Sequence, residues 1–158
     1  YDGHRACGVS FAPPETKKNN NVCPVCGRGL TIGVMNRVAA LADRPEAYHD
    51  ARRTPFKSII PLYEVIAEAL NVGKTAKAVA ATYAKLIQAF HSEFSILLDV
   101  PIQQIAQAGW PAVAEAVDRV RQGRVHIKPG FDGEFGEIAI FSDEDRKNIQ
   151  KSTQTTLF

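Results

Sequence analysis

The sequence has few cysteines, no long apolar run and almost no net charge. Its three cysteines are an odd number, which argues against a disulfide framework, and two of them form a Cys-x2-Cys pair that suits a metal ion in a reducing cytoplasm. No apolar run approaches the roughly 20 residues that span a bilayer. The formal net charge is only +2, so any nucleic-acid-binding face must come from local clustering of basic residues.

The chain also lacks an initiator methionine and a signal peptide. It begins at Tyr1 in polar sequence, and we expect it to be a piece of a longer, cytoplasmic protein. With 158 residues and a hydrophobic content of 45%, its composition is that of a folded chain rather than a disordered one. The length fits one domain, or a small metal-binding lobe followed by a helical domain.

Glycine, proline and asparagine punctuate residues 1–31, which predicts a zinc-binding lobe of loops and short strands. Residues 32–141 carry apolar stripes at helical spacing and then two alternating segments around a glycine-rich loop. The apolar run 94–100 is of ambiguous type, and residues 142–158 form a polar tail. The predicted fold class is α+β, with a small zinc-knuckle lobe followed by a mainly α-helical domain with a C-terminal β-hairpin. The expected helices are 31–41, 61–70, 75–90, 102–106 and 111–121, and the expected strands are 124–128 and 137–141.

A two-knuckle metal site is the most specific motif in the sequence. Its expected ligands are His4, Cys7, Cys23 and Cys26. Zinc prefers four such ligands in a tetrahedron, and a two-residue gap lets one tight turn present two of them. Four protein ligands leave no open position for water, so the predicted zinc ion is structural and supplies folding free energy on the order of 10 kcal/mol. The alternatives are that the cysteines are buried thiols, or that a cysteine upstream of Tyr1 replaces His4.

Seven motifs, spread over nearly all of residues 2–141, carry a family resemblance. They are DGHRACGV at 2–9, CPVCG at 23–27, LTIGV at 30–34, ADRPE at 42–46, PFKSIIPL at 55–62, EFSILLDV at 93–100 and PGFDGEFG at 129–136. In these motifs the sequence resembles the endonuclease Q family, which are PHP-domain DNA repair nucleases of archaea and some bacteria. The resemblance implies a zinc module and a helical domain that help grip DNA containing a deaminated base. It also implies an N-terminal PHP domain that holds the catalytic metals and nicks the strand beside that base.

The chain departs from this family because the PHP domain, with its metal-ligating histidines and aspartates, is absent from it. Three histidines follow the metal motif, and none has a metal-ligand partner at short spacing; they are His49, His91 and His126. We therefore expect no catalytic residue and no DNA cleavage by this chain alone, whereas the parent protein is expected to be a metal-dependent endonuclease. Some bacterial relatives are described as, or fused to, UvrD-like helicases, so a helicase is a further implied neighbour in the parent.

Two groups of residues are candidates for contacting DNA. In the first, basic side chains that neutralise phosphates are interleaved with Tyr48 and Phe56, whose rings can stack on a base. Its basic members are Arg37, Arg44, Arg52, Arg53 and Lys57. The second group is Phe131 and Phe135 in the glycine-rich hairpin loop, which can approach a base closely. The alternatives are a solvated loop for the first group and core packing of both rings for the second.

The last five residues resemble the pentapeptide that binds the bacterial sliding clamp. Gln154 would anchor one subsite, and Leu157 and Phe158 would fill a hydrophobic pocket. An apolar pair at the end of a polar tail serves no purpose in folding, which favours docking. The alternative is a linker that leads into a helicase.

The preferred interpretation is a DNA-binding, structural-zinc C-terminal region of a DNA repair endonuclease that nicks DNA at deaminated bases. Its catalytic PHP domain would lie outside this chain. A second interpretation is a protein-interaction adaptor region of a nuclease or helicase that docks on the sliding clamp. A third, an enzyme in its own right, is disfavoured because the sequence offers no nucleophile–base pair and no open metal site.

Overall fold

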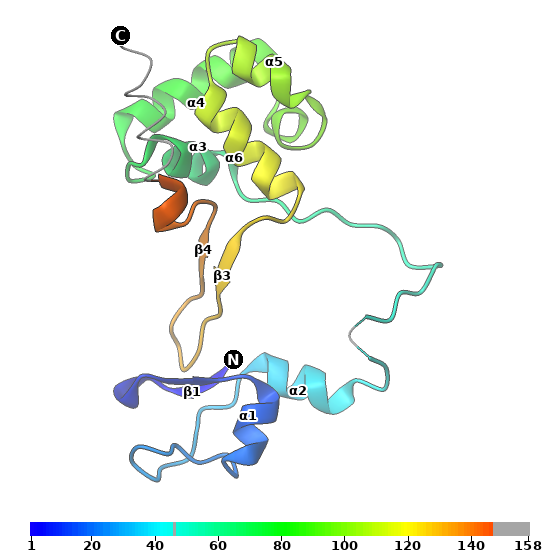
Figure 1. The fold of residues 1–158 in the computed structure, drawn as a ribbon, viewed down its shortest axis with the longest axis vertical. Helices are drawn as coiled ribbons and strands as arrows, with labels where there is room; N and C mark the ends of the chain where they lie inside the picture. Colours follow the sequence, from blue (N-terminus) through cyan, green and yellow to red (C-terminus); the bar gives the residue numbers. More distant parts are fainter. Residues whose placement is uncertain (46, 147–158) are drawn as a thin grey trace. The chain divides into compact units, whose positions relative to one another are not determined.

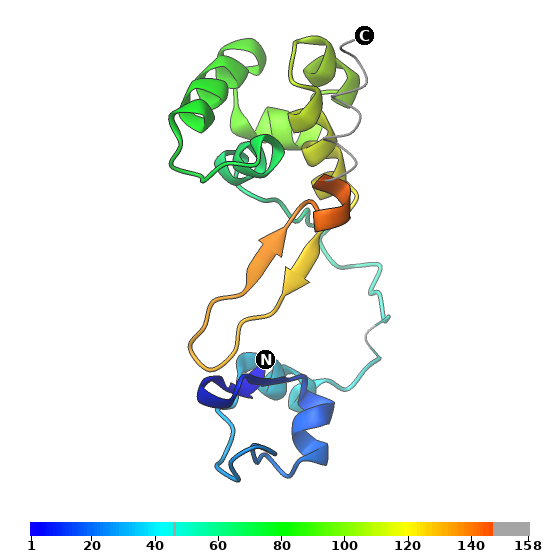
Figure 2. The same ribbon diagram turned by 60° about the vertical axis from the view of Figure 1, so that its left-hand side comes forward.

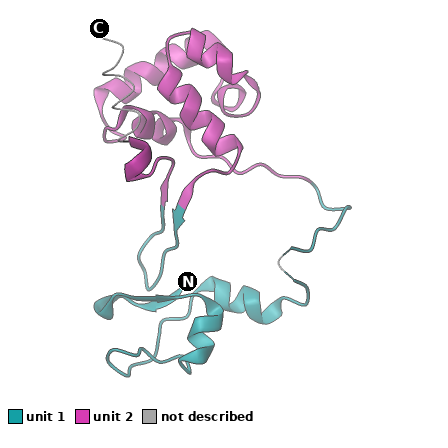
Figure 3. Cartoon of the chain, in the orientation of Figure 1, with its two compact units in different colours: residues 1–54, 127–137 teal, residues 55–126, 138–158 magenta. Residues whose placement is uncertain are grey.

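The computed structural model describes residues 1–45 and 47–146 of the chain (Figure 1). The chain forms two compact units, which Figure 3 shows in different colours. Within the described ranges, unit 1 consists of residues 1–45, 47–54 and 127–137, and unit 2 consists of residues 55–126 and 138–146. Among the described residues, no helix is both long and apolar enough to cross a membrane.

Unit 1 begins with a small antiparallel sheet. Strand β1 (Asp2–His4) pairs with strand β2 (Val9–Phe11), and the 3-10 helix η1 (Arg5–Cys7) turns the chain between them. Helix α1 (Pro13–Lys18) follows, where the sequence predicts only loops and short strands. Its two prolines stand in the first turn, where a helix needs no backbone N–H donors, so they start this helix rather than break it.

Helix α2 (Val34–Leu41) starts three residues later than the predicted helix 31–41. The delay has a physical cause, because Thr31 exchanges two backbone hydrogen bonds with Gly3 of β1, of 2.9 and 2.8 Å, and is thereby held in extended conformation. No residue of α2 is buried. The small apolar core of unit 1 lies elsewhere and consists of Val9, Cys23 and Leu30, with Cys7 and Phe11 packed against it.

Unit 2 is a set of helices around one apolar core (Figure 2). The helices are α3 (Leu62–Leu70), α4 (Lys77–Phe90), the π-helix η2 (Ser95–Asp99), α5 (Ile102–Gln107) and α6 (Pro111–Arg121). Helix α6 packs against both α3 and α5, and α3 also packs against α4. The predicted apolar stripes face this core, and Val65, Leu86 and Val117 are fully buried. The ambiguous run 94–100 forms the π-helix η2.

Half-buried polar contacts hold the start of α3 and the last described turn of unit 2 in place. Glu93 accepts hydrogen bonds from the backbone N–H of Leu62 (2.8 Å) and from the hydroxyl of Tyr83 (3.0 Å), so it caps the start of α3. In the last described turn, the Asp145 carboxylate lies 2.8 Å from the Arg119 guanidinium. These contacts give polar partners to groups that packing would otherwise leave unsatisfied.

The predicted C-terminal hairpin is present as strands β3 (His126–Lys128) and β4 (Glu137–Ala139). Both strands are shorter than the predicted 124–128 and 137–141. The second one ends early because Ile140 and Phe141 turn into the core of unit 2, where both are buried. A knuckle near the N-terminus, a helical bulk and a terminal hairpin together confirm the predicted α+β class.

Candidate functional site

The candidate metal ligands come from two short turns of unit 1. His4 ends β1 and Cys7 ends η1, while Cys23 and Cys26 lie on the loop that follows α1. Their four ligand atoms all lie within 4.8 Å of one another, and His4 Nδ1 lies 3.3 Å from Cys26 Sγ. In a tetrahedral site with metal–sulfur bonds of about 2.3 Å, the sulfur atoms stand about 3.8 Å apart. The set can therefore close around one metal ion with small movements.

Each knuckle is closed by a glycine in the left-handed region. Gly8 has a φ of 64° and donates to the Arg5 carbonyl at 3.0 Å, and Gly27 has a φ of 73° and donates to the Cys23 carbonyl at 2.9 Å. A residue with a Cβ adopts this conformation only at a cost, so the glycines allow the chain to turn tightly behind the ligands.

The protein environment affects two of the thiols in opposite ways. Burial, together with the neighbouring thiols of Cys26 and Cys23, raises the pKa of Cys7 to about 11. Burial alone would also disfavour the Cys23 thiolate, but the backbone N–H groups of Cys26 and Val25 and the side chain of His4 outweigh it and lower the pKa of Cys23 to about 6. Cys23 is therefore the more readily ionised of the two thiols at neutral pH, and a metal ion that used Cys7 as a ligand would have to displace its proton.

A buried carboxylate lies two residues before the first ligand. Asp2 accepts hydrogen bonds from the Thr16 hydroxyl (2.6 Å), the Gly33 N–H (2.7 Å) and the Asn36 amide (2.8 Å). Burial opposes ionisation, but these hydrogen bonds prevail and lower the pKa of Asp2. Asp2 therefore ties β1 to both helices of unit 1. Sequence reasoning missed this role, because a single aspartate in a polar segment carries no sign of burial.

The tip of the hairpin, residues 129–136, packs on the same part of unit 1. Asp132 accepts hydrogen bonds from the Arg5 N–H at 2.6 Å and the Thr31 hydroxyl at 2.5 Å, and these two donors lower the pKa of its carboxyl. The amino group of Tyr1 donates to the Gly130 carbonyl at 2.8 Å. The Asp132-Gly133 pair signals a turn in the sequence, but no feature of the sequence indicates what that turn contacts.

The two aromatic residues of the hairpin tip have different surroundings. The Phe131 ring lies against the backbone of β1, where a Cβ on Gly3 would come within 3.0 Å of it. Phe135 is 99% exposed. Core packing of both rings, the alternative to DNA contact, therefore does not describe Phe135.

Two of the candidate basic side chains already have acidic partners. Arg44 lies 3.6 Å from the Asp43 carboxylate and 4.6 Å from the centre of the Tyr48 ring. Arg52 holds both oxygens of Asp50, with Nε–Oδ1 and Nη2–Oδ2 distances of 3.1 and 2.9 Å. Asp50 raises the pKa of Arg52, and Arg52 lowers that of Asp50. Both pairs are at the surface, where a phosphate can compete for the cation.

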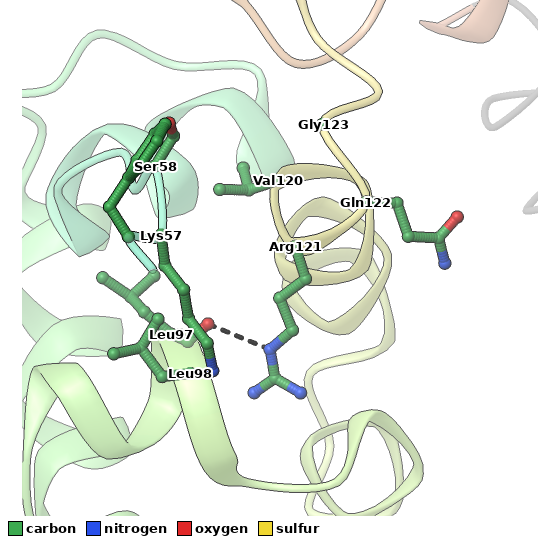
Figure 4. A pocket seen from close by; sticks show the side chains of 9 residues that line it. Lys57, Ser58, Leu97, Leu98, Val120, Arg121, Gln122 and Gly123 are labelled. Carbon is green, nitrogen blue, oxygen red and sulfur yellow. Dashed lines mark hydrogen bonds between the residues drawn. The ribbon is translucent and has the colours of Figure 1, made fainter. Parts of the chain in front are cut away.

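The remaining candidates are distributed over both units. Arg37 is exposed on α2 and Arg53 is exposed in unit 1, whereas Lys57 belongs to unit 2 and lines a pocket there (Figure 4). Among the described residues, the only group of three or more histidine, cysteine or acidic side chains suited to a metal ion is the four-ligand set. The clamp candidates Gln154, Leu157 and Phe158 lie outside the described residues.

Comparison with known proteins identifies relatives of both units. Residues 61–124 match the family described as the MJ0043 C-terminal domain. The protein MJ0043 of Methanocaldococcus jannaschii is 33% identical over 134 residues, which are 85% of this chain and 17% of that protein. YqxK of Bacillus subtilis is 29% identical over 134 residues, which are 84% of this chain and 30% of that protein.

Two solved structures share the fold over almost the whole chain. One is the lesion-specific endonuclease PfuEndoQ from Pyrococcus furiosus, with a TM-score of 0.74 and 31% identity over 93% of this chain and 38% of that one. The other is endonuclease Q in complex with a 27-mer duplex substrate that has an abasic lesion at the active site, with a TM-score of 0.71 and 31% identity over 90% of this chain and 35% of that one. The chain spans less than two fifths of each matched protein. These matches confirm the resemblance to endonuclease Q that the motifs indicate.

Proposed function

Since the chain is similar in sequence and fold to a region of endonuclease Q, we propose that it is the DNA-binding, structural-zinc region of a DNA repair endonuclease. The parent protein would nick DNA at deaminated bases, with its catalytic PHP domain in a part outside this chain. The observation that carries the proposal is the match to endonuclease Q over at least 90% of this chain.

The donor set supports zinc as the ion. Three thiolates and one imidazole are soft or borderline ligands, which zinc binds in closed tetrahedral sites. Such an ion would supply structural stability to unit 1, whose own apolar core consists of only three buried residues. His4, Cys7, Cys23 and Cys26 would hold it, and their number leaves no position for a reactive water.

DNA as a partner is supported by the complex of endonuclease Q with its duplex and by the exposed groups of unit 1. Arg37, Arg52 and Arg53 supply exposed positive charge, and Phe135 supplies an exposed ring on the hairpin loop that Asp132 anchors to Arg5. Cations on phosphates and a ring on an unstacked base are two of the means by which proteins bind damaged strands. The chain would contribute binding, and the chemistry would belong to the rest of the parent.

The test is DNA binding by the purified chain, measured by fluorescence anisotropy. The duplexes contain deoxyuridine, deoxyinosine, an abasic site or no lesion. We expect binding that weakens steeply as salt rises, and a loss of about tenfold in the Arg52→Ala/Arg53→Ala double variant. The matched control is Lys17→Ala/Lys18→Ala, which removes two exposed charges from α1 and should change the affinity less. Absence of binding at low salt, or equal losses in both double variants, would contradict the proposal.

A second candidate function rests on the last five residues, whose pattern favours docking on a sliding clamp through Gln154, Leu157 and Phe158. In that case the chain, or a helicase joined to it, would be delivered to replicating DNA. The test is binding to purified clamp in the intact chain and in a chain that ends at residue 153. Equal binding by both would exclude this role.

A further inference from the structure

Unit 2 contains a pocket of about 400 Å³, a size typical of small-ligand sites (Figure 4). It lies between the segment that leads into α3, the π-helix η2 and the C-terminal end of α6. The residues that form its walls and bear on its chemistry are Phe56, Lys57, Leu97, Leu98, Val120 and Arg121. No part of the candidate metal site is among them.

One side of the pocket is apolar. Leu97 is fully buried beneath it, while Leu98 and Phe56 present more of their surface. Phe56 keeps 70% of its surface exposed, although it stands beside a pocket with an apolar wall. A flat ligand in the pocket would cover apolar surface that now faces water.

The other side carries two cations. Arg121 donates from Nε to the Leu97 carbonyl at 2.9 Å and from Nη2 to the carbonyls of Ile96 and Val100 at 2.8 and 2.7 Å. These bonds close the end of η2 and hold the guanidinium in place. Its Nη1 has no hydrogen-bond partner among the described residues.

Lys57 extends in the same direction as Arg121 in Figure 4, and it forms no ion pair or hydrogen bond with a described residue. Burial lowers the pKa of Arg121, and the nearby carboxylates of Asp99 and Asp118 offset only part of this effect. Asp118 is itself engaged by Arg124 at 2.9 Å. The two cations are therefore incompletely neutralised by the protein.

We propose that this pocket binds one unstacked nucleotide of a DNA strand. The phosphate would lie between Lys57 and Arg121, and the base would lie over Phe56 and Leu98. An inorganic anion needs no apolar wall, and an apolar ligand needs no cations, whereas a nucleotide uses both. The inference rests on the proposed function in one respect, which is that DNA is the source of the nucleotide.

The experiment measures binding of a ten-residue oligothymidylate to the full chain by anisotropy, with thymidine 5′-monophosphate and inorganic phosphate as competitors. Lys57→Ala and Phe56→Ala should each weaken binding by about tenfold. Lys57→Ala should also lower the slope of log affinity against log salt by about 0.7, whereas Phe56→Ala should leave the slope unchanged. Lys85→Ala and Phe94→Ala, which alter exposed residues of unit 2 outside the pocket, are the matched controls. Both should bind the oligothymidylate as tightly as the unsubstituted chain does.

The proposal is overturned if both pocket variants bind the oligothymidylate as tightly as the unsubstituted chain, or if the control variants lose as much affinity as the pocket variants. It is also overturned if inorganic phosphate competes as well as the nucleotide, because the pocket would then be an anion site only. Duplex binding by the same proteins separates this inference from the proposed function. Strong duplex binding with unaffected pocket variants leaves only the proposed function standing, whereas competition by the nucleotide without duplex binding leaves only the pocket.

Discussion

Single residues of unit 1 connect its short elements to one another. Asp2 is the central one, because its carboxylate accepts hydrogen bonds from three segments and is fully buried. If this buried carboxylate is replaced, its donors are left without an acceptor. The free-energy cost of those unsatisfied donors exceeds the net contribution of the hydrogen bonds themselves. The contacts of β1 with α1 and α2 therefore depend on this side chain.

We expect Asp2→Asn to destabilise unit 1 by about 2 kcal/mol, because the new amide nitrogen must face at least one of the donors. The measurement is hydrogen exchange of the amides of β1 and β2 in the intact chain. Asp43→Asn, at an exposed position in the same unit, is the control and should leave exchange unchanged. Unaltered protection in Asp2→Asn would contradict the role given to this carboxylate.

Asp145 predicts a pH dependence of unit 2. Hydrogen bonds from Arg119 and then from the hydroxyl and N–H of Ser142 hold the pKa of Asp145 well below its usual range. Because the pKa is lower in the folded chain than in the unfolded one, the carboxylate stabilises unit 2 at neutral pH. That stabilisation is lost as the pH falls below about 3.9 toward the folded pKa.

Asp145→Asn should therefore lower the free energy of unfolding at about pH 7 and have much less effect near pH 2.5. Urea denaturation followed by helical circular dichroism measures both values. Asp143→Asn, which alters an exposed neighbour, provides the comparison. An equal loss at both pH values would mean that the ionised carboxylate is not what stabilises this turn.

Among the elements, the hairpin tip carries one packed ring and one exposed ring in the same loop. Phe131 packs on β1, whereas Phe135 is almost fully exposed. Phe131→Ala should destabilise unit 1 by about 2 kcal/mol, since it removes a partly buried ring. Phe135→Ala should change stability by less than about 0.5 kcal/mol and weaken DNA binding by about fivefold.

Thermal unfolding and anisotropy on the same two variants separate these effects. Weaker DNA binding by Phe135→Ala with an unchanged melting curve would support a direct contact. If Phe135→Ala instead bound DNA with the same affinity as the unsubstituted chain, the hairpin tip would be a packing element alone.

The elements also show what the sequence reveals and what it conceals. Helices α3, α4 and α6 were predictable because residues such as Val65, Leu86 and Val117 recur at helical spacing, and all three are buried. The pairing of His4 with Cys7 and of Cys23 with Cys26 was predictable because each pair is local. The hydrogen bond between Arg5 and Asp132 joins residues 127 positions apart, and no periodic pattern encodes such a contact.

For the whole molecule, the two units differ in the size of their apolar cores. Unit 2 has a continuous apolar core, whereas the core of unit 1 is small, and one of its three buried residues, Cys23, belongs to the four-residue His/Cys set. We expect a strong chelator, or Cys23→Ser, to abolish hydrogen-exchange protection in unit 1, because the ion supplies on the order of 10 kcal/mol to small zinc modules. The helical signal of unit 2 should persist.

Metal analysis of the purified chain should accordingly find one zinc ion per molecule. Val25→Ser changes an exposed residue inside the same knuckle without touching a ligand, so it should retain the ion. Full protection of unit 1 after chelation would show that the lobe folds without metal.

The order in which the chain leaves the ribosome gives the division into units a further consequence. Unit 1 takes its first 54 residues from the start of the chain and its last part from residues 127–137. At about 5–20 residues per second, translation of the intervening segment takes several seconds. During that time Gly3, Arg5 and Thr31 have no hairpin tip to contact. The helices α3 to α6, which lie between these residues and the hairpin in the sequence, can already pack. Within this chain, unit 1 therefore begins before unit 2 but is completed only after most of the helical segment has been synthesised.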